Sequence, residues 1–391
     1  IILKLLWSQK MPGFELIGKE EIDEINHLFN ESSILFRHSF DHLRNGIFKV
    51  NDFENAFSKR MNIPHSLGVT SGTAALRVAL AALELEPDDE VITQSFTFVA
   101  TVEAIIESRA VPVITNIDKT LNMDPDDLVK KITKKTKAII VVHMLGVPCR
   151  LREIKKITDD NGILLIEDTA WGCGGFYEKK PLGTYGDIGT YSFDFAKTIT
   201  TGEGGMVVFK EKSLYEKAAA WHDHGHENNP KLPRWEDSRS GSGFNYRMNE
   251  MQGAVGLAQL KKLDYVVERQ RENGEIIKNI LARYPIELRD VPDMSYETYD
   301  ALVFFVSDNN VAIKCRKNLI DNGIGTKILP EAITWHFAGT WTHMPELGNG
   351  LEKKFLKSKQ LLDRSVSIPI SVNMADNFDK SIKSALDKVF L

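Results

Sequence analysis

The chain has 391 residues, of which 42% are hydrophobic, so it can bury a large core and divide into two domains. Its 49 basic and 54 acidic residues give a formal charge of -5, without the sustained basic tract that nucleic-acid binding requires. The three cysteines, Cys149, Cys173 and Cys315, lie far apart, which argues against disulfides and metal-type spacing and favours a reduced, cytoplasmic location. We therefore expect a protein that acts on small molecules.

The first ten residues, IILKLLWSQK, are apolar but shorter than a membrane-spanning helix. They also lack the small-residue cleavage site of a signal peptide, so no membrane partner is predicted. We expect the natural start to be Met11, and residues 1–10 are excluded from functional reasoning.

From about residue 66, short β-branched runs alternate with amphipathic stretches. The expected strands are SLGVTS (66–71), EVITQS (90–95), VPVITNI (111–117), KAIIVVHML (137–145) and ILLIED (163–168). The expected helices are GTAALRVALAALEL (72–85), TFVATVEAIIESR (97–109), PDDLVKKI (125–132) and LREIKKITDDNG (151–162). Strands that alternate with helices of this length predict an α/β domain, with a mostly parallel sheet covered on both faces.

The pattern changes near residue 190. GTYSFDF (189–195) and GGMVVFK (204–210) are joined too closely for a crossover helix, so we expect antiparallel neighbours. Residues 222–243 are predicted to form a long loop, and a helix is expected over 247–273. The later segments ALVFFV, CRKNLIDNG and SVSIPI suit a smaller α/β domain. We expect a large domain over 12–268 and a small C-terminal domain over 269–391.

The segment TSGTAAL (70–76) places small residues where a strand ends and a helix begins. The orphan N–H groups and the macrodipole of such a helix start bind phosphate. An ordinary N-cap by Ser71 or Thr73 is the alternative. No Gly-Lys-Ser/Thr follows, so the segment is not a P-loop.

Two further side chains are expected at the same edge of the sheet as the phosphate site. Asp168 ends a buried strand, where a carboxylate needs a cation or donor such as a protonated ring nitrogen; alternatively, Glu167 or Asp168 caps the next helix. Lys197 lies between the two strands near residue 190, and a desolvated lysine beside cations can form a Schiff base with an aldehyde. Phosphate site, acid and lysine together are what a pyridoxal 5′-phosphate pocket needs.

Six segments, in order, resemble the DegT/DnrJ/EryC1/StrS family of sugar aminotransferases: TSGTAAL, EVITQSFTFVATVEAI, TKAIIVVHMLG, LIEDTAWGCGG, SFDFAKTITTGEGGMVV and GFNYRMNEMQGAVG. The resemblance runs from about Gly13 to Pro369, nearly the whole chain. It implies the aspartate aminotransferase (fold type I) architecture, with a three-layer α/β/α large domain, and pyridoxal 5′-phosphate as cofactor.

The resemblance also implies roles for individual residues. Lys197 matches the Schiff-base lysine, and Asp168 matches the carboxylate that keeps the pyridine nitrogen protonated. The other matched positions are Gly72 and Thr73 at the phosphate, Ser192 as a second phosphate contact, Phe98 stacked on the cofactor, and Asn245 reaching the phosphate of the second subunit. The last of these implies a homodimer with shared active sites.

One position departs from the family. Trp171 stands where the family usually has Gln or His, three residues after the Asp, and an indole offers only an N–H donor and a large apolar face. The usual contact to the cofactor hydroxyl is therefore in question at this position. Donation of a hydrogen bond, shaping of the sugar pocket and plain packing are the alternatives for Trp171.

The implied reaction transfers an amino group from L-glutamate to a carbonyl sugar, with Lys197 as general base and acid. MPGFELIG, HDHGHENNP and ITWHFAGTWTHM further resemble a subgroup that forms 8-amino-3,8-dideoxy-manno-octulosonate (8-amino-Kdo), a lipopolysaccharide sugar, from a free 8-oxo sugar acid. Arg234, Arg239 and Arg247 are candidates to clamp its carboxylate, with solvated or interface arginines as the alternative.

His222, His224 and His226 would share one face if their segment were extended, as zinc ligands can. No fourth ligand pattern is evident, so we expect no metal; contact with substrate, for which His224 is a candidate, or packing within the loop are the alternatives. His336 is a candidate sugar contact, with a core histidine as the alternative.

Three rival functions compete with the aminotransferase. A sugar 3-dehydratase of the same fold replaces the Schiff-base lysine with histidine, which Lys197 argues against. A nicotinamide dehydrogenase is disfavoured because no Gly-x-Gly-x-x-Gly follows an early strand. A non-catalytic sensor or scaffold that binds the cofactor would need an output module, and no segment of helix-turn-helix type is visible.

Overall fold

The computed structural model describes residues 12–229, 231–330 and 333–391. The expectation that the natural chain starts at Met11 concerns residues outside this part. Within the described ranges, no helix has both the length and the apolar character needed to cross a bilayer.

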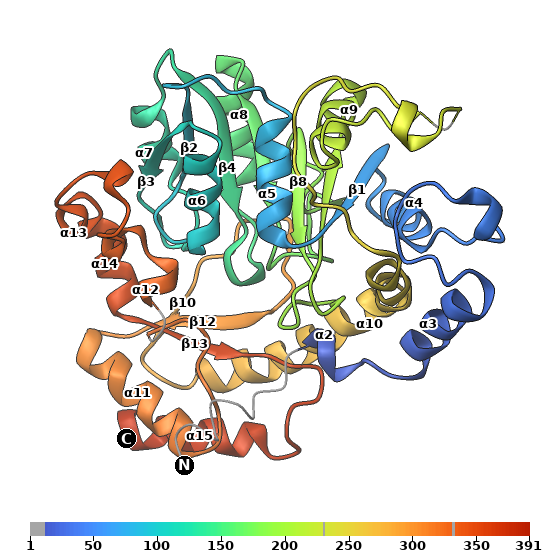
Figure 1. The fold of residues 1–391 in the computed structure, drawn as a ribbon. Coiled ribbons are helices and arrows are strands. Elements are labelled where there is room, and N and C mark those ends of the chain that lie inside the picture. The colour runs from blue at the N-terminus through green and yellow to red at the C-terminus, as the bar shows by residue number, and fades with distance from the viewer. Residues whose placement is uncertain (1–11, 230, 331–332) are drawn as a thin grey trace.

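A seven-stranded sheet in the order β1-β9-β8-β5-β4-β2-β3 forms the centre of the molecule (Figure 1). Its strands are β1 (His65–Val69), β2 (Glu90–Gln94), β3 (Val111–Thr115), β4 (Thr136–Val142), β5 (Leu164–Asp168), β8 (Ile188–Ser192) and β9 (Gly205–Phe209). Only β9 runs antiparallel to its neighbours β1 and β8. The α/β class, the mostly parallel sheet and the antiparallel pair near residue 190 are therefore confirmed.

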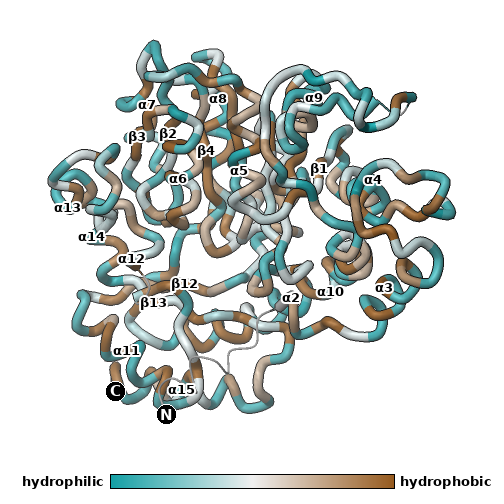
Figure 2. Tube along the Cα trace, in the orientation of Figure 1, coloured by the Kyte–Doolittle hydropathy of each residue, from teal (hydrophilic) through white to brown (hydrophobic). Residues whose placement is uncertain are grey.

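Helices cover both faces of this sheet, as the apolar strand sequences require. In β4, Ala138 and Ile140 pack on one face, while Ile139 and Val141 pack on the other. The first face is covered by α5 (Gly72–Ala81), α6 (Val99–Glu107) and α9 (Lys212–Trp221). The second is covered by α4 (Lys49–Met61), α7 (Pro125–Lys131), α8 (Leu151–Asn161) and α10 (Glu250–Leu281). Figure 2 shows hydrophobic segments along the central strands β2 and β4.

A second, three-stranded sheet lies below the first in Figure 1. It contains β10 (Glu287–Leu288), β12 (Ala301–Phe305) and β13 (Ser365–Pro369), and it packs against α11 (Asn309–Asp321) and α15 (Phe378–Phe390). The long helix α10 contacts α3 and α4 as well as α15 and β12, so the expected boundary at residue 268 falls inside one continuous helix. The division into domains 12–268 and 269–391 stays a prediction.

The other elements are short, apart from α3. A third small sheet joins β11 (Ser295–Tyr296), β6 (Phe176–Tyr177) and β7 (Lys180–Pro181). The remaining helices are α2 (Pro12–Glu15), α3 (Lys19–Glu31), α12 (Ile333–His336), α13 (Leu351–Lys354), α14 (Leu356–Asp363) and the 3-10 turns η1 (Asp41–Leu43), η2 (Met144–Gly146), η3 (Arg234–Glu236), η4 (Ala338–Thr340) and η5 (Pro345–Leu347). The predicted loop over 222–243 is confirmed, because η3 is the only helical turn in its described residues.

Candidate active site

A cavity of about 340 Å³ opens where the central parallel strands end. Asp168 is the last residue of β5 and Ser192 the last of β8, so both side chains stand at the carboxyl edge of the sheet. The cavity is lined by Ser71, Gly72, Thr73, Leu76, Phe98, Ala100, Thr101, Val142, Asp168, Ala170, Trp171, Thr190, Tyr191, Ser192, Asp194, Ala196, Lys197, Glu203 and His336. Most of the sequence-predicted cofactor residues therefore meet in one place.

Lys197 lies in the connection between β8 and β9 and is held by its main chain. Its N–H donates to the carbonyl of Asp194 at 3.1 Å, and its carbonyl accepts from the N–H of Gly13 at 2.9 Å. A Cβ at Gly13 would lie 2.6 Å from that carbonyl oxygen, so only glycine allows this approach. Burial lowers the pKa of Lys197 to about 8, with Asp300 opposing and Lys327 reinforcing the shift. The amine is therefore partly neutral near physiological pH.

Trp171 presents its indole ring to this amine. The Nζ atom of Lys197 lies 3.6 Å from the ring centroid, which is a close cation–π contact. The Nζ atom of Lys327 lies 4.8 Å from the same centroid. Plain packing therefore does not describe Trp171 fully, because its ring also contacts the amino groups of two lysines beside the cavity.

Two neighbouring carboxylates at the end of β5 have different surroundings. Glu167 accepts hydrogen bonds from His143 Nε2 and from the N–H groups of Gly183, Tyr185 and Gly186. Burial acts to raise the pKa of Glu167, but these hydrogen bonds outweigh it and hold the pKa below its usual range. All four donors fix Glu167 as a structural group outside the cavity.

Asp168 instead lines the cavity and has fewer donors. Its Oδ1 accepts from the Ala170 N–H at 3.1 Å and its Oδ2 from the Thr101 hydroxyl at 3.2 Å. Burial raises the pKa of Asp168, and these hydrogen bonds oppose the shift. The capping alternative is wrong, because residues 170–174 form turns and the next helix after β5 is α9; Oδ1 closes a turn at Ala170 instead. The position of the carboxyl group allows a cationic partner in the cavity.

The start of α5 combines a cap with an open anion site. The Ser71 hydroxyl accepts from the Ala74 N–H at 3.0 Å, so the N-cap alternative is correct for this side chain. Gly72 and Thr73 line the cavity in the first turn, where N–H groups have no partner within a helix. A Cβ at Gly72 would lie 2.7 Å from Ser192 Cβ. The absence of a side chain at Gly72 therefore keeps this cradle open beside Ser192.

Aromatic side chains form another wall. Phe98, the N-cap residue of α6, lies 6.2 Å from Trp335 in a stacked arrangement and 5.4 Å from His336, as measured between ring centroids. His336 is buried but lines the cavity, and its ring lies 6.3 Å from that of Trp171. This wall can accept a flat ring or the apolar face of a sugar.

The sequence profile of the DegT/DnrJ/EryC1/StrS aminotransferase family matches residues 39–387. The chain belongs to this family. It is 37% identical over 282 residues to the GDP-perosamine synthase of Escherichia coli O157:H7, covering 71% of this chain and 75% of that protein. It is 30% identical over 402 aligned positions to the spore coat polysaccharide biosynthesis protein SpsC of Bacillus subtilis, covering 96% and 95%.

Solved structures agree with this membership. Helicobacter pylori PseC, an aminotransferase involved in the biosynthesis of pseudoaminic acid, superposes with a TM-score of 0.85 at 25% identity, covering 97% of this chain and 98% of PseC. The predicted fold type I architecture and the aminotransferase class are confirmed. The cofactor of this enzyme is pyridoxal 5′-phosphate, as predicted.

The cavity fits this cofactor on three observations. The cradle at Gly72 is a place that a Cβ would fill, at the N-terminus of a ten-residue helix suited to a phosphate. Asp168 supplies a buried acid at the strand edge, and Lys197 supplies an amine whose pKa is lowered. Thr101, which donates to Asp168, was missed by the sequence reasoning because nothing in a helical apolar segment marks one threonine.

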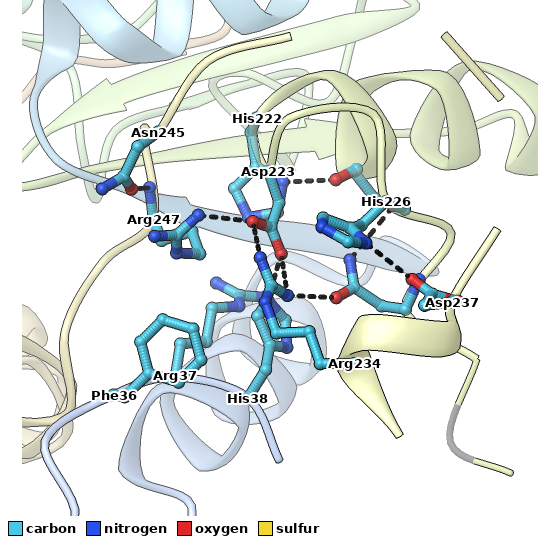
Figure 3. A network of polar contacts seen from close by, with 12 residues as sticks. Phe36, Arg37, His38, His222, Asp223, His226, Arg234, Asp237, Asn245 and Arg247 are labelled. Carbon is cyan, nitrogen blue, oxygen red and sulfur yellow. Dashed lines mark hydrogen bonds and ion pairs between the residues drawn. The ribbon is translucent and has the colours of Figure 1, made fainter. Parts of the chain in front are cut away.

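None of the three arginine candidates lines the cavity. Figure 3 shows Arg234 and Arg247 in a polar network around Asp223 instead. Arg234 and Arg247 both pair with the buried Asp223, and Arg234 does so through both terminal nitrogens. Burial opposes ionisation of Asp223, but the hydrogen bond from Arg234 and the charge of Arg247 hold its pKa below its usual range. Arg239 is exposed and joins His226 through a backbone bridge. The predicted contact of these arginines with substrate therefore has no support within this chain.

Asn245 also lies outside its own cavity. Its Oδ1 accepts from the Arg247 N–H at 3.3 Å, and its backbone bridges to Asp223. Asn245 is exposed, as is the neighbouring Phe244. The residue is therefore available to another molecule.

The three histidines of the loop are not on an extended strand, which corrects the geometry considered for a metal. His224 has a left-handed φ of 56° and is exposed, since the chain turns there. His222 Nδ1 lies 2.5 Å from the Ala219 carbonyl oxygen, and His226 Nδ1 lies 3.1 Å from Asp237. In the described parts of the chain, no group of three His, Cys, Asp or Glu side chains is arranged to hold a metal.

Proposed function

We propose that this enzyme transfers an amino group from L-glutamate to a carbonyl sugar, with 8-oxo-3,8-dideoxy-manno-octulosonate as the preferred acceptor and 8-amino-Kdo as the product. The proposal places the enzyme in lipopolysaccharide sugar biosynthesis. One observation carries the transaminase part: Lys197, Asp168 and the Gly72 cradle line a single cavity. The choice of acceptor is supported by the three segments that resemble the 8-amino-Kdo subgroup.

When bound, the cofactor acts as an electron sink for the carbon that loses its proton. Lys197 would hold the cofactor in the resting enzyme and then move that proton at its Nζ atom, which its lowered pKa favours near neutral pH. Asp168 would pair with the ring nitrogen and keep it protonated. Gly72, Thr73 and Ser192 would bind the phosphate.

The aromatic wall would orient the ring and the substrate. Phe98 would stack on the cofactor, and Trp171 would shape the pocket through its face without replacing the acceptor of a Gln or His side chain. His336 is the substrate candidate that the cavity geometry supports. His224 and Arg239 are exposed, so their proposed contacts with substrate would require a second subunit.

A homodimer with shared active sites would complete the cradle. Asn245 is exposed, lies outside its own cavity and would reach the phosphate of the partner. Phe244, which precedes Asn245, and Trp235, which follows Arg234, are both exposed aromatic residues, and such residues often mark a surface that a partner covers. Arg234 and Arg247 would then approach the partner's substrate, although both are already paired with Asp223.

The alternative acceptor is a nucleotide-linked keto sugar. The similarity to a GDP-perosamine synthase favours this class. The deciding experiment incubates the holoenzyme and L-glutamate with the 8-oxo acid or with GDP- and UDP-linked keto sugars, and identifies aminated products by mass spectrometry. Amination of a nucleotide sugar alone would reject the 8-amino-Kdo assignment, and amination of neither class would reject sugar amination altogether.

A further inference from the structure

A chain of two buried hydroxyl groups leads to the carboxyl group of Asp168. The side chains of Thr97 and Thr101 are both 0% exposed, and their Oγ1 atoms lie 2.8 Å apart. The Oγ1 atom of Thr101 lies 3.2 Å from Oδ2 of Asp168. Thr101 and Asp168 line the cavity, whereas Thr97 is not part of its lining. The chain of hydroxyl groups therefore begins behind the cavity wall and ends on it.

The direction of these hydrogen bonds follows from the chemistry of the groups. An ionised carboxylate only accepts hydrogen bonds, and a threonine hydroxyl has one proton, so Thr101 donates to Asp168. Thr101 in turn accepts from Thr97, because the other acceptor for the Thr97 hydroxyl, the carbonyl oxygen of Phe98, is more distant at 3.4 Å. Hydrogen bonds in a chain polarise one another, so both hydroxyl groups strengthen the bond to the carboxylate.

Asp168 depends on such donors because burial disfavours its charge. Burial raises the pKa of Asp168, and the Ala170 N–H opposes this shift most strongly. Lys197, Thr101 and His143 oppose it as well. In the described parts of the chain, Thr101 is the only side chain that donates a hydrogen bond to Asp168. Thr101 also lies in the first turn of α6, where the helix dipole favours an anion.

We propose that Thr101 is a positioning residue for the cofactor: its hydroxyl keeps Asp168 ionised, so that the proton shared with the pyridine ring stays on the ring nitrogen. A carboxylate that loses a hydrogen-bond donor is a stronger base and would take this proton from the ring. A ring without the proton is a weaker electron sink. Under the proposed function Asp168 pairs with the ring nitrogen, and the role of Thr101 rests on that pairing.

The test measures the protonation of the ring directly. Holoenzyme is prepared with pyridoxal 5′-phosphate that carries ¹⁵N in its ring, and the chemical shift of this nitrogen is recorded by NMR. Thr101→Val keeps the shape of the side chain and removes the hydroxyl, whereas Thr101→Ser keeps the hydroxyl. The matched control is Thr93→Val, which removes a buried hydroxyl that donates to the Ile140 carbonyl at 2.9 Å and is not part of the cavity lining.

The unaltered holoenzyme, Thr93→Val and Thr101→Ser should all show the resonance of a protonated pyridine. In Thr101→Val the resonance should move toward the position of an unprotonated ring. The rate constant of the half-reaction with L-glutamate should fall about tenfold or more in the same variant, because proton removal needs the electron sink. Thr97→Val should cause a smaller shift in the same direction, since Thr101 keeps its own bond to the carboxylate.

A fully protonated ring in Thr101→Val would overturn the role of Thr101 and leave Asp168 as the partner of the ring. An equal shift in Thr93→Val would overturn it too, because the change would then reflect general packing. If Thr101→Val takes up too little cofactor for NMR, equal resonances in Thr97→Val and Thr93→Val would overturn the role instead. An unprotonated ring in the unaltered holoenzyme would overturn the proposed pairing of Asp168, and the role of Thr101 with it. The NMR results do not depend on which sugar is aminated.

Discussion

Two substitutions of charged residues near Lys197 are predicted to shift its pKa in opposite directions. Burial lowers the pKa of Lys197 from 10.5 to about 8, which corresponds to roughly 3 kcal/mol against the ammonium form. Asp300 acts against this shift, and Lys327 acts with it. Asp300→Asn removes the favourable charge and leaves Lys327 unpaired, so the pKa of Lys197 should fall by about one unit. Lys327→Met removes a like charge and leaves Asp300 without its ion-pair partner, so the pKa of Lys197 should rise by about one unit.

The assay is the rate at which the apoprotein takes up pyridoxal 5′-phosphate covalently, measured from about pH 6 to about pH 10. Only the neutral amine attacks the aldehyde, so the rate should rise with pH and level off above the pKa of Lys197. The inflection is expected near 8 in the unaltered protein, with the two variants on either side of it. Lys357→Met, which removes the ammonium of a separate ion pair with Asp124, should leave this inflection in place. Shifts in the same direction, or no shift in either variant, would refute this account of the electrostatics.

Four further predictions concern single sites. Lys197→Ala should abolish turnover and covalent cofactor uptake with little change in Tm, and surviving turnover would contradict the proposed role of the lysine. Gly72→Ala places a Cβ 2.7 Å from Ser192 Cβ, so equilibrium dialysis should show cofactor affinity weakened by about tenfold or more. Asp223→Asn leaves two arginines without their buried carboxylate and should lower the free energy of unfolding in urea by about 3–5 kcal/mol; an unchanged midpoint would show that the pairs contribute little. If sites are shared and Asn245→Ala and Lys197→Ala are each inactive alone, an equal mixture of the two should recover about a quarter of wild-type activity, whereas full activity of Asn245→Ala alone would contradict a shared site.

The stability from Asp223 also has a defined pH dependence. Its folded pKa is held below the ordinary value of 3.8, so the ionised carboxylate stabilises the protein above that value. The contribution should be lost progressively as the pH falls below about 4, because the unfolded chain then binds the proton first. Thermal unfolding at several acidic pH values should show a smaller loss for Asp223→Asn than for the unaltered chain.

The sequence predicted the site well where local pattern and sheet geometry decide it. Strand and helix periods placed Asp168 at a strand end, and carboxyl ends of parallel strands share an edge, so its meeting with Lys197 could be expected. Element ends were less accurate: α10 continues to Leu281, beyond the expected 273, because its later turns pack against the second sheet.

Other parts of the site depend on packing between distant segments. Nothing in the sequence near Asp300 or Lys327 indicates that they meet each other and Trp171, because that contact follows from how the second sheet lies against the first. The arginine candidates were judged by charge alone. Asp223 lies in the same segment, but only the fold shows that it is the common partner of Arg234 and Arg247.

The link between Gly13 and Lys197 also bears on the order in which the enzyme matures. Gly13 leaves the ribosome long before Lys197 is synthesised, yet its N–H fixes the carbonyl of that lysine. The N–H of Gly13 therefore has no such partner during synthesis until the β8–β9 connection has left the ribosome and folded against the segment around Gly13. The proposed covalent attachment of pyridoxal 5′-phosphate to Lys197 would therefore come late in biogenesis, because a nascent chain stalled before residue 197 lacks that amine.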